Sequence, residues 1–194
     1  MRPENNYCAH CGMPVDPAQD QPLFIVEGLT SLFNVVFFES LLEQELNRAM
    51  RYGHPLSVLV AEVDGLSDLE AAYGYSTTNE LVRKVGETIA NAIRDPDTLA
   101  STSRVAALGT QRFLVLMPET DEEGAFSAAE KIRSLVTNHP FELGDGPAGV
   151  TVSIGVASAT GSENADVNLL ARGTQALIES RAKGPNRVQV AAAT

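Results

Sequence analysis

The chain has 194 residues, of which 44% are hydrophobic and 20% are charged, a composition typical of folded globular proteins. This length can bury a substantial core without disulfides or metals. Lys and Arg total 14 against 25 Asp and Glu, so the formal net charge is −11. Such a surface disfavours DNA or RNA, whose binding depends on cationic neutralisation of phosphates, but it leaves room for a small nucleotide at one local site.

No apolar run approaches the ~20 residues that cross a bilayer, so no membrane span is expected. The N-terminus lacks the apolar stretch of a secretion signal, which favours a cytoplasmic location. Residues 1–27 form a lead-in with little periodicity that carries both cysteines. The sequence therefore predicts a short N-terminal segment, residues 1–27, followed by one domain, residues 28–194.

The first predicted elements are a helix, a strand and a helix. Apolar residues recur at helical spacing from Thr30 until Gly53 and Pro55 end the pattern. Residues 56–63 are rich in β-branched residues and predict a short buried strand. A second helix is expected to reach Arg94, with Thr77 or Thr78 as its N-cap.

The second half of the chain predicts a hairpin, a helix, a strand, a helix and a final short strand. The hairpin strands are expected at residues 103–108 and 113–117. Thr120-Asp-Glu-Glu123 resembles a capping box, and the buried face of its helix would hold Phe126, Ala129, Ile132 and Val136. Alternation over residues 150–156 indicates a strand with one buried face. A helix around residues 169–177 and a strand at 187–190 end the chain.

This order predicts an α+β fold with a ferredoxin-like, polymerase-palm βαββαβ core and a flanking helix at each end. Fold alone does not assign function.

Five ordered segments resemble the GGDEF family, the domain of diguanylate cyclases, which make cyclic di-GMP from two GTP molecules. They are Gly28-Leu-Thr-Ser-Leu-Phe-Asn34, Arg48-Ala-Met-Arg-Tyr-Gly-His-Pro-Leu-Ser57, Ala106-Ala-Leu-Gly-Thr-Gln-Arg-Phe-Leu-Val-Leu-Met-Pro-Glu-Thr120, Thr151-Val-Ser-Ile-Gly-Val-Ala157 and Gly184-Pro-Asn-Arg-Val188. The resemblance covers residues 28–190 and implies the palm-like fold and a nucleotide site.

The catalytic positions that the resemblance implies are altered. The family uses carboxylates from the first strand and from the Gly-Gly-Asp-Glu-Phe turn to hold two Mg²⁺ ions. Glu62 occupies the place of the usual strand Asp, and Asp64 follows it. The turn reads Gly109-Thr110-Gln111-Arg112-Phe113. It therefore offers a neutral amide and a cation where two acids are expected, and a cation near a metal site repels Mg²⁺.

The substrate contacts implied by the resemblance are altered as well. The guanine-reading Asn and Asp correspond to Glu70 and Asn79, and the phosphate-contacting Phe-Lys pair corresponds to 66–67, a Leu-Ser pair. Arg181 replaces a phosphate-binding Lys and keeps its charge, whereas Pro185 replaces an Arg. Glu62, Asp64, Asn79 and Arg181 are thus the remaining candidates for nucleotide or metal contact.

Each candidate also has a structural interpretation. Glu62 could end a strand at the surface, and Arg112 could be a solvated residue at a hairpin tip. Arg181 in a last helical turn suits the helix dipole without any ligand.

Arg94-Asp-Pro-Asp97 matches the R-x-x-D motif through which many family members bind cyclic di-GMP as an inhibitor. Asp97 lies twelve residues before Gly109, whereas the family spacing is six. Either an insertion of six residues has displaced the motif, or the match is accidental, since this tetrapeptide also suits a helix end and turn.

Tyr7-Cys8-Ala-His-Cys11-Gly12 resembles one knuckle of a zinc ribbon. A structural Zn²⁺ needs four ligands and a single knuckle supplies two, so Cys8 and Cys11 would need a second chain to complete a site. An inert turn and redox chemistry are the alternatives.

The sequence thus predicts a degenerate GGDEF protein without cyclase activity, a signalling or scaffold protein that binds a protein partner or a second copy of itself. The alternative is a receptor that binds GTP or cyclic di-GMP without turnover, and an active cyclase ranks third. Zn²⁺ at Cys8 and Cys11 is the candidate cofactor, and Mg²⁺ is expected only together with a nucleotide.

Overall fold

The structure is a computed structural model that describes residues 15–16, 21–22, 25–102, 111–144, 146–160 and 168–192. Six strands form the central sheet in the order β10-β9-β4-β6-β5-β3. Their bounds are β3 Phe33–Asn34, β4 Leu56–Val63, β5 Thr98–Ser101, β6 Arg112–Pro118, β9 Val152–Ala159 and β10 Val188–Val190. Two short pairs lie outside it, β1 Val15–Asp16 with β2 Gln21–Pro22 and β7 Phe141–Leu143 with β8 Gly146–Ala148.

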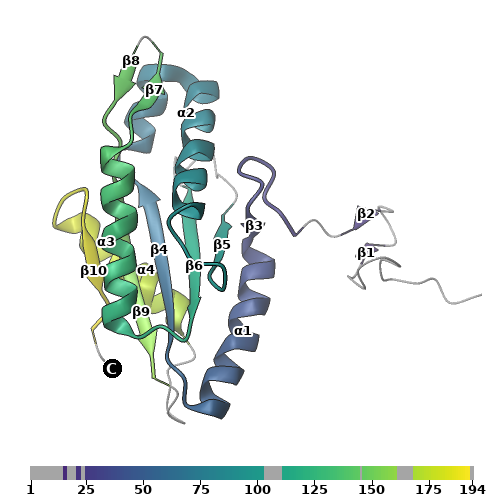
Figure 1. Ribbon diagram of the computed structural model, residues 1–194. Helices are drawn as coiled ribbons and strands as arrows, with labels where there is room; N and C mark the ends of the chain where they lie inside the picture. Colours follow the sequence, from purple (N-terminus) through teal and green to yellow (C-terminus); the bar gives the residue numbers. More distant parts are fainter. Residues whose placement is uncertain are drawn as a thin grey trace, which may run out of the picture.

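Four helices cover both faces of the sheet (Figure 1): α1 Val35–Tyr52, α2 Leu66–Ala90, α3 Glu122–Asn138 and α4 Leu169–Ala182. Helices α2 and α3 pack on one face in a core that includes Leu59, Ala61 and Val63 of β4. Helices α1 and α4 pack on the other face against Val58 and Val60. The odd-numbered residues of β4 therefore pack against α2 and α3 and the even-numbered residues against α1 and α4, because successive side chains of a strand point to opposite faces.

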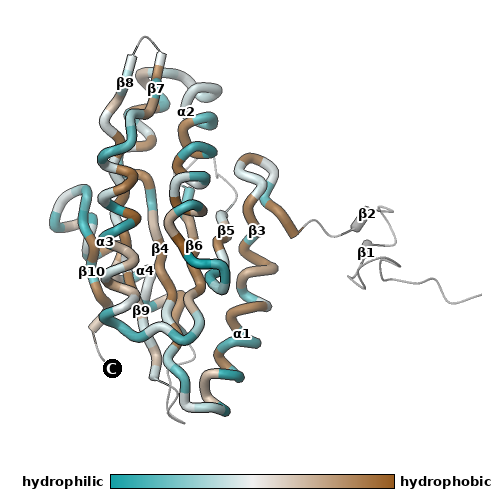
Figure 2. Tube along the Cα trace, in the orientation of Figure 1, coloured by the Kyte–Doolittle hydropathy of each residue, from teal (hydrophilic) through white to brown (hydrophobic). Residues whose placement is uncertain are grey.

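Figure 2 shows hydrophobic and hydrophilic residues alternating along the helices. This is the pattern of helices that bury one face against the sheet. β4 is buried at all eight of its residues. A strand covered on both sides needs an almost continuous apolar run, which β4 has.

The predicted α+β, palm-like order is confirmed: β4-α2-β5-β6-α3-β9 forms the core, preceded by α1 and followed by α4. The strand predicted at 56–63 is observed with those bounds. The strand predicted at 150–156 is observed as β9, but the expectation of one buried face is wrong, because Ser153 is fully buried as well.

Three helix starts differ from the predictions. α1 begins at Val35, where the Asn34 side chain accepts a hydrogen bond from the Phe37 amide, so residues 30–34 precede the helix. α2 begins at Leu66 and breaks at Gly74, whose φ of 80° interrupts the helix. Thr78 is therefore not an N-cap, and its hydroxyl donates to the Gly74 carbonyl.

The third helix, α3, is capped by Asp121 rather than Thr120, because the Asp121 carboxylate accepts from the Gly124 amide. Phe126 is 41% exposed and Ala125 takes its place in the core, so the predicted buried face is one residue off at its first turn. Thr120 instead donates to the Pro118 carbonyl.

β6 pairs with β4 on one side and with β5, Thr98–Ser101, on the other, and the sequence predicted no strand at 98–101. The strand expected at 103–108 falls outside the described residues. Ser101 lies opposite Phe113, so the link between β5 and β6 runs from Thr102 to Gln111 and is longer than the predicted hairpin turn. None of the helices in the described part of the chain combines the length and hydropathy needed to cross a bilayer.

Helix α4 lies so close to β9 that only glycine fits between them. A Cβ at Gly155 would sit 2.1 Å from the Gly173 carbonyl oxygen and 2.3 Å from the Leu177 nitrogen, both backbone atoms. We predict that Gly155→Ala lowers the free energy of unfolding in urea by about 3 kcal/mol, because the helix must move away from the sheet. Gly149→Ala is the matched control, since a Cβ there meets nothing within 4 Å and should change stability little. Equal stability of the two variants would contradict this packing.

Candidate functional site

The candidate site lies where β4 and β6 meet at one end of the sheet. Glu62 and Arg112 are directly opposite each other in the antiparallel register. The even-numbered residues of both strands face α1 and α4, and Glu62 and Arg112 are among these even-numbered residues. The two side chains therefore emerge side by side beneath the last turn of α4, which carries Arg181.

Glu62 is held between two arginines. Arg112 Nε donates to Glu62 Oε2 at 3.2 Å, and Arg181 Nη1 donates to Glu62 Oε1. The Glu62 side chain is only 2% exposed, against 37% for Arg112 and 45% for Arg181. A buried carboxylate is costly unless it is paired, and here each oxygen has its own cation.

These contacts correct two structural interpretations from the sequence and add a partner to the third. Glu62 does not end its strand at the surface, since it is buried. Arg112 is not a freely solvated tip residue, and Arg181 has a side-chain partner besides the helix dipole. The sequence could not show this, because the three residues meet only through strand register and helix packing.

Asp64 is fully engaged in a different set of contacts. Its Oδ1 accepts from Ser153 Oγ at 2.7 Å, and its Oδ2 accepts from Thr151 Oγ1 at 2.7 Å and from the Asn186 amide at 2.9 Å. The carboxylate thus ties the start of β9 to the loop after α4. Sequence reasoning missed these partners, although Thr151, Ser153 and Asn186 all stand in quoted family segments.

Asn186 anchors the same loop to α3. Its φ of 59° places it in the left-handed region, which Asn tolerates better than most residues. Its Oδ1 accepts from Arg133 Nη1 at 2.8 Å and from Thr137 Oγ1 at 3.0 Å. The loop that follows α4 is therefore fixed by Asp64 from one side and by α3 from the other.

The remaining described residues of the turn are buried. Phe113 is fully buried and packs so closely on Gly86 of α2 that a Cβ there would lie 3.1 Å from its ring. Gln111 is also fully buried, and its amide has no hydrogen-bond partner among the described residues. Gly109 and Thr110 lie outside the described residues, as do Cys8 and Cys11.

The positions that correspond to the guanine contacts and to the Phe-Lys pair lie on α2, whereas Arg181, at the phosphate-binding Lys position, belongs to the Glu62 cluster. Leu66 is part of the hydrophobic core, so its place is explained by packing. Ser67 is exposed. Glu70 and Asn79 are half-buried on either side of the break at Gly74, and both make contacts within the protein.

Arg94 and Asp97 lie at the opposite end of the sheet. Thr98, the residue after Asp97, pairs with Leu116, whereas Arg112 stands at the far end of β6. Asp97 accepts from Arg94 Nε at 3.2 Å and from Arg94 Nη2 at 2.8 Å, and Arg94 Nη2 also donates to Thr120 at 2.7 Å. The hydrogen bond to Asp97, aided by its charge, raises the pKa of Arg94.

The register bears on the spacing of the Arg94–Asp97 motif. The strand that directly follows Asp97 pairs with the strand that directly follows Gln111. The link from Thr102 to Gln111 therefore lies between the motif and the turn, and the insertion and the accidental match both stay predictions. The contacts themselves are those of a tight turn between α2 and β5.

The model of the family described as "Diguanylate cyclase, GGDEF domain" matches residues 25–187. The chain belongs to the GGDEF family. This membership confirms the resemblance found in the sequence, but it does not test the altered residues of the turn.

The GGDEF domain has curated relatives that are much longer. Diguanylate cyclase DosC of Escherichia coli strain K12 is 29% identical over 166 residues, covering 85% of this chain and 35% of DosC. Response regulator PleD of Caulobacter vibrioides strain NA1000 is 29% identical over 168 residues, covering 86% of this chain and 36% of PleD. The chain therefore spans about a third of the length of these relatives.

Solved structures agree with the fold. The GGDEF domain of FimX from Pseudomonas aeruginosa superposes with a TM-score of 0.77 at 22% identity, covering 86% of this chain and 99% of that one. The GGDEF domain of DgcB from Caulobacter crescentus, solved with c-di-GMP, gives 0.76 at 22% identity, covering 87% and 94%. At this identity the likeness establishes the fold alone.

The residues present do not fit the family's Mg²⁺ site. The Glu62 carboxylate, which would ligate the metal, is already bound by two cations that would repel a divalent ion. Asp64 already accepts three hydrogen bonds. Among the described residues no group of three or more His, Cys, Asp and Glu side chains is placed to hold a metal.

The Arg112–Glu62–Arg181 cluster leads to a prediction about the free energy of unfolding. Arg112→Met with Arg181→Met should lower the free energy of unfolding by about 3 kcal/mol, because a buried carboxylate is left without cations. This is the low end of the usual range, since both guanidinium groups are partly exposed. Adding Glu62→Met should recover most of the loss, measured by urea denaturation. A double variant as stable as the parent would show that Glu62 does not depend on these cations.

Proposed function

We propose that this GGDEF domain makes no cyclic di-GMP and acts as a signalling or scaffold module through contacts with another protein or a second copy of itself. The observation that carries the proposal is the burial of Glu62 between Arg112 and Arg181. This arrangement puts positive charge where the family's chemistry requires Mg²⁺. Phosphoryl-transfer sites of this kind depend on metal ions to neutralise the phosphates.

The altered positions on α2 support the proposal. Glu70 and Asn79 replace the residues expected to read guanine, and Leu66 is committed to the core. Such a reaction requires a positioned substrate as well as metal ligands. The solved structure of the cyclase SiaD from Pseudomonas aeruginosa in complex with its activator SiaC illustrates that a protein with this fold can carry a protein interface.

The purified chain should form no detectable cyclic di-GMP from GTP with Mg²⁺ or Mn²⁺, under conditions in which DosC is active. Calorimetric titration with GTP and with cyclic di-GMP separates the scaffold from the receptor alternative, since only a receptor releases heat at a defined stoichiometry. Product formation that disappears in Glu62→Ala would overturn the proposal.

Restoring the turn alone should not restore activity. In Gln111→Asp with Arg112→Glu, the new glutamate stands directly opposite Glu62, and two carboxylates would share a buried edge with Arg181 alone. We expect lower stability and no turnover. Robust activity of this variant would show that the substitutions on α2 and at Pro185 matter little.

We also propose that residues 28–194 form the folded domain and that Cys8 and Cys11, in the segment 1–27, bind Zn²⁺ only by pairing with the same residues of a second chain. Metal analysis should then give about one Zn²⁺ per two chains, because Cys₄ sites need four ligands. Cys8→Ser with Cys11→Ser should reduce the dimer fraction in analytical ultracentrifugation and leave the melting of the monomer unchanged. One tightly held Zn²⁺ per monomer would contradict the bridging site.

A further inference from the structure

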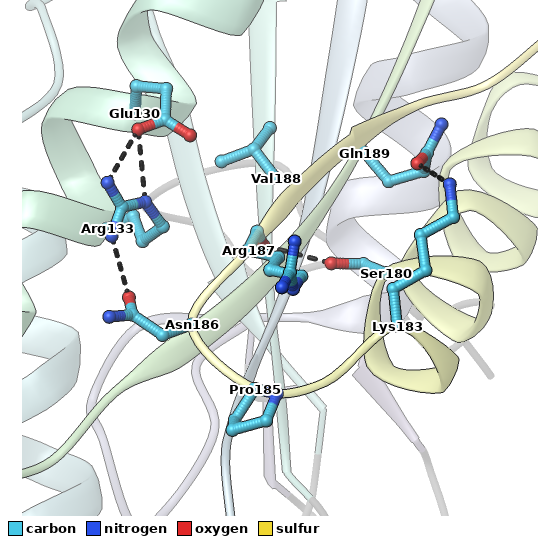
Figure 3. A pocket seen from close by; sticks show the side chains of 9 residues that line it. All are labelled: Glu130, Arg133, Ser180, Lys183, Pro185, Asn186, Arg187, Val188 and Gln189. Carbon is cyan, nitrogen blue, oxygen red and sulfur yellow. Dashed lines mark hydrogen bonds and ion pairs between the residues drawn. The ribbon is translucent and has the colours of Figure 1, made fainter.

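A groove of about 610 Å³ runs along the outer edge of the sheet, between α3 and the end of α4 (Figure 3). It lies beside the Glu62 cluster but shares none of its residues. Glu130 and Arg133 of α3 lie on one side of the groove, Lys183 at the end of α4 lies on the other, and Arg187 lies between them (Figure 3). Between them the groove exposes part of β10, the last strand of the sheet.

The outer edge of β10, of which Val188 and Gln189 line the groove, carries backbone groups that no other described strand pairs. The Arg187 carbonyl accepts from the Ile154 amide, and the Ala191 amide donates to the Val156 carbonyl, so odd residues of this segment bond to β9. Alternation in a parallel ladder then turns the peptide groups of Val188 and Val190 away from β9. No strand formed by the described residues pairs with them on that side, although the Val190 carbonyl accepts from Gln189 Nε2 at 2.8 Å.

The walls of the groove carry a local positive charge on an otherwise acidic chain. Glu130 is matched by Arg133, which binds it at 2.8 Å. This leaves Lys183 and Arg187, a net charge of +2, against −11 for the whole chain. Lys183 bonds to Gln189 with one of its three N–H groups, and the Arg187 guanidinium makes no hydrogen bond with the described part of the chain.

The two faces of β10 differ in character. Val188 and Val190 pack against the core beneath α2 and α3, whereas Gln189 reaches Lys183 at the end of α4. A strand added to this edge would have alternate side chains beside the valines and beside the cations. The matching sequence therefore alternates apolar and acidic residues.

We propose that the β10 groove binds an extended acidic segment of a partner protein, which adds a strand to the sheet with its carboxylates at Lys183 and Arg187. The proposal rests on the protein-contact part of the proposed function and names the surface and the chemistry of the partner. An unpaired edge supplies backbone hydrogen bonds, and the side chains that flank it supply specificity. A small phosphate would use the two cations but leave the backbone edge unpaired.

The remaining negative charge of the chain does not cancel this attraction. Exposed charges separated by more than about 8 Å are largely screened at physiological ionic strength, whereas Lys183 and Arg187 would contact the segment directly. Binding should therefore persist at 0.15 M salt and weaken as salt is raised further.

The probe is the peptide acetyl-Thr-Val-Glu-Val-Glu-Val-Thr-amide, titrated onto the full chain by NMR and by fluorescence anisotropy of a labelled form. Saturation should slow hydrogen exchange of the Val188 and Val190 amides at least tenfold. A peptide with Lys in place of Glu should not bind. A peptide with Pro in place of its central Val keeps the charge but cannot pair fully, and should bind at least tenfold more weakly.

Arg187→Glu with Lys183→Glu should weaken binding of the acidic peptide at least tenfold. Both residues are exposed, so the fold is expected to persist. Arg83→Glu with Lys84→Glu is the matched control, because it makes the same change in net charge on the outer surface of α2, and it should bind the peptide as the parent does.

The proposal would be overturned by no binding of the acidic peptide, by binding without slower exchange at Val188 and Val190, or by equal loss of binding in the α2 control. Competition by inorganic pyrophosphate with no effect on those amides would indicate an anion site only. Peptide binding is read independently of cyclase activity. A chain that made cyclic di-GMP yet bound the peptide would overturn the proposed inactivity and leave the groove standing.

Discussion

The burial of one carboxylate governs the architecture of the site. Glu62 stands at the end of the central strand beneath α4, where an unpaired charge would be strongly destabilising. Arg112 reaches it from the neighbouring strand and Arg181 from the last turn of α4. Three elements far apart in the sequence are thereby joined by one charge, and the same pairing removes the negative potential that a divalent cation would need.

The second acid of this region has become a structural residue. Asp64 binds Thr151 and Ser153 beside it and the amide of Asn186 across the loop after α4. Asn186 in turn binds Arg133 and Thr137 of α3. The loop that lines the β10 groove is therefore held in place by Asp64 and by α3.

Local signals predicted those elements whose pattern is strong. β4 and β6 are apolar enough to be identified without knowing what covers them. Errors arose where a neighbour in space decides the outcome. Thr120 could cap α3 by sequence, but its hydroxyl donates to Pro118 and accepts from Arg94, and Asp121 caps the helix. Thr78 likewise bonds back to Gly74, because the left-handed glycine breaks α2 one turn earlier.

The sequence by itself determined the α+β order, the GGDEF membership and the replacement of both turn acids, since each is written in consecutive residues. Only the tertiary structure decided what the replacements do. Register places Arg112 opposite Glu62, and packing of α4 on Gly155 brings Arg181 onto the same carboxylate. The tertiary structure also decided which backbone groups of β10 no other described strand pairs. Charges and hydrogen bonds act over a few ångströms in space, and strand register and helix packing alone set which residues come that close.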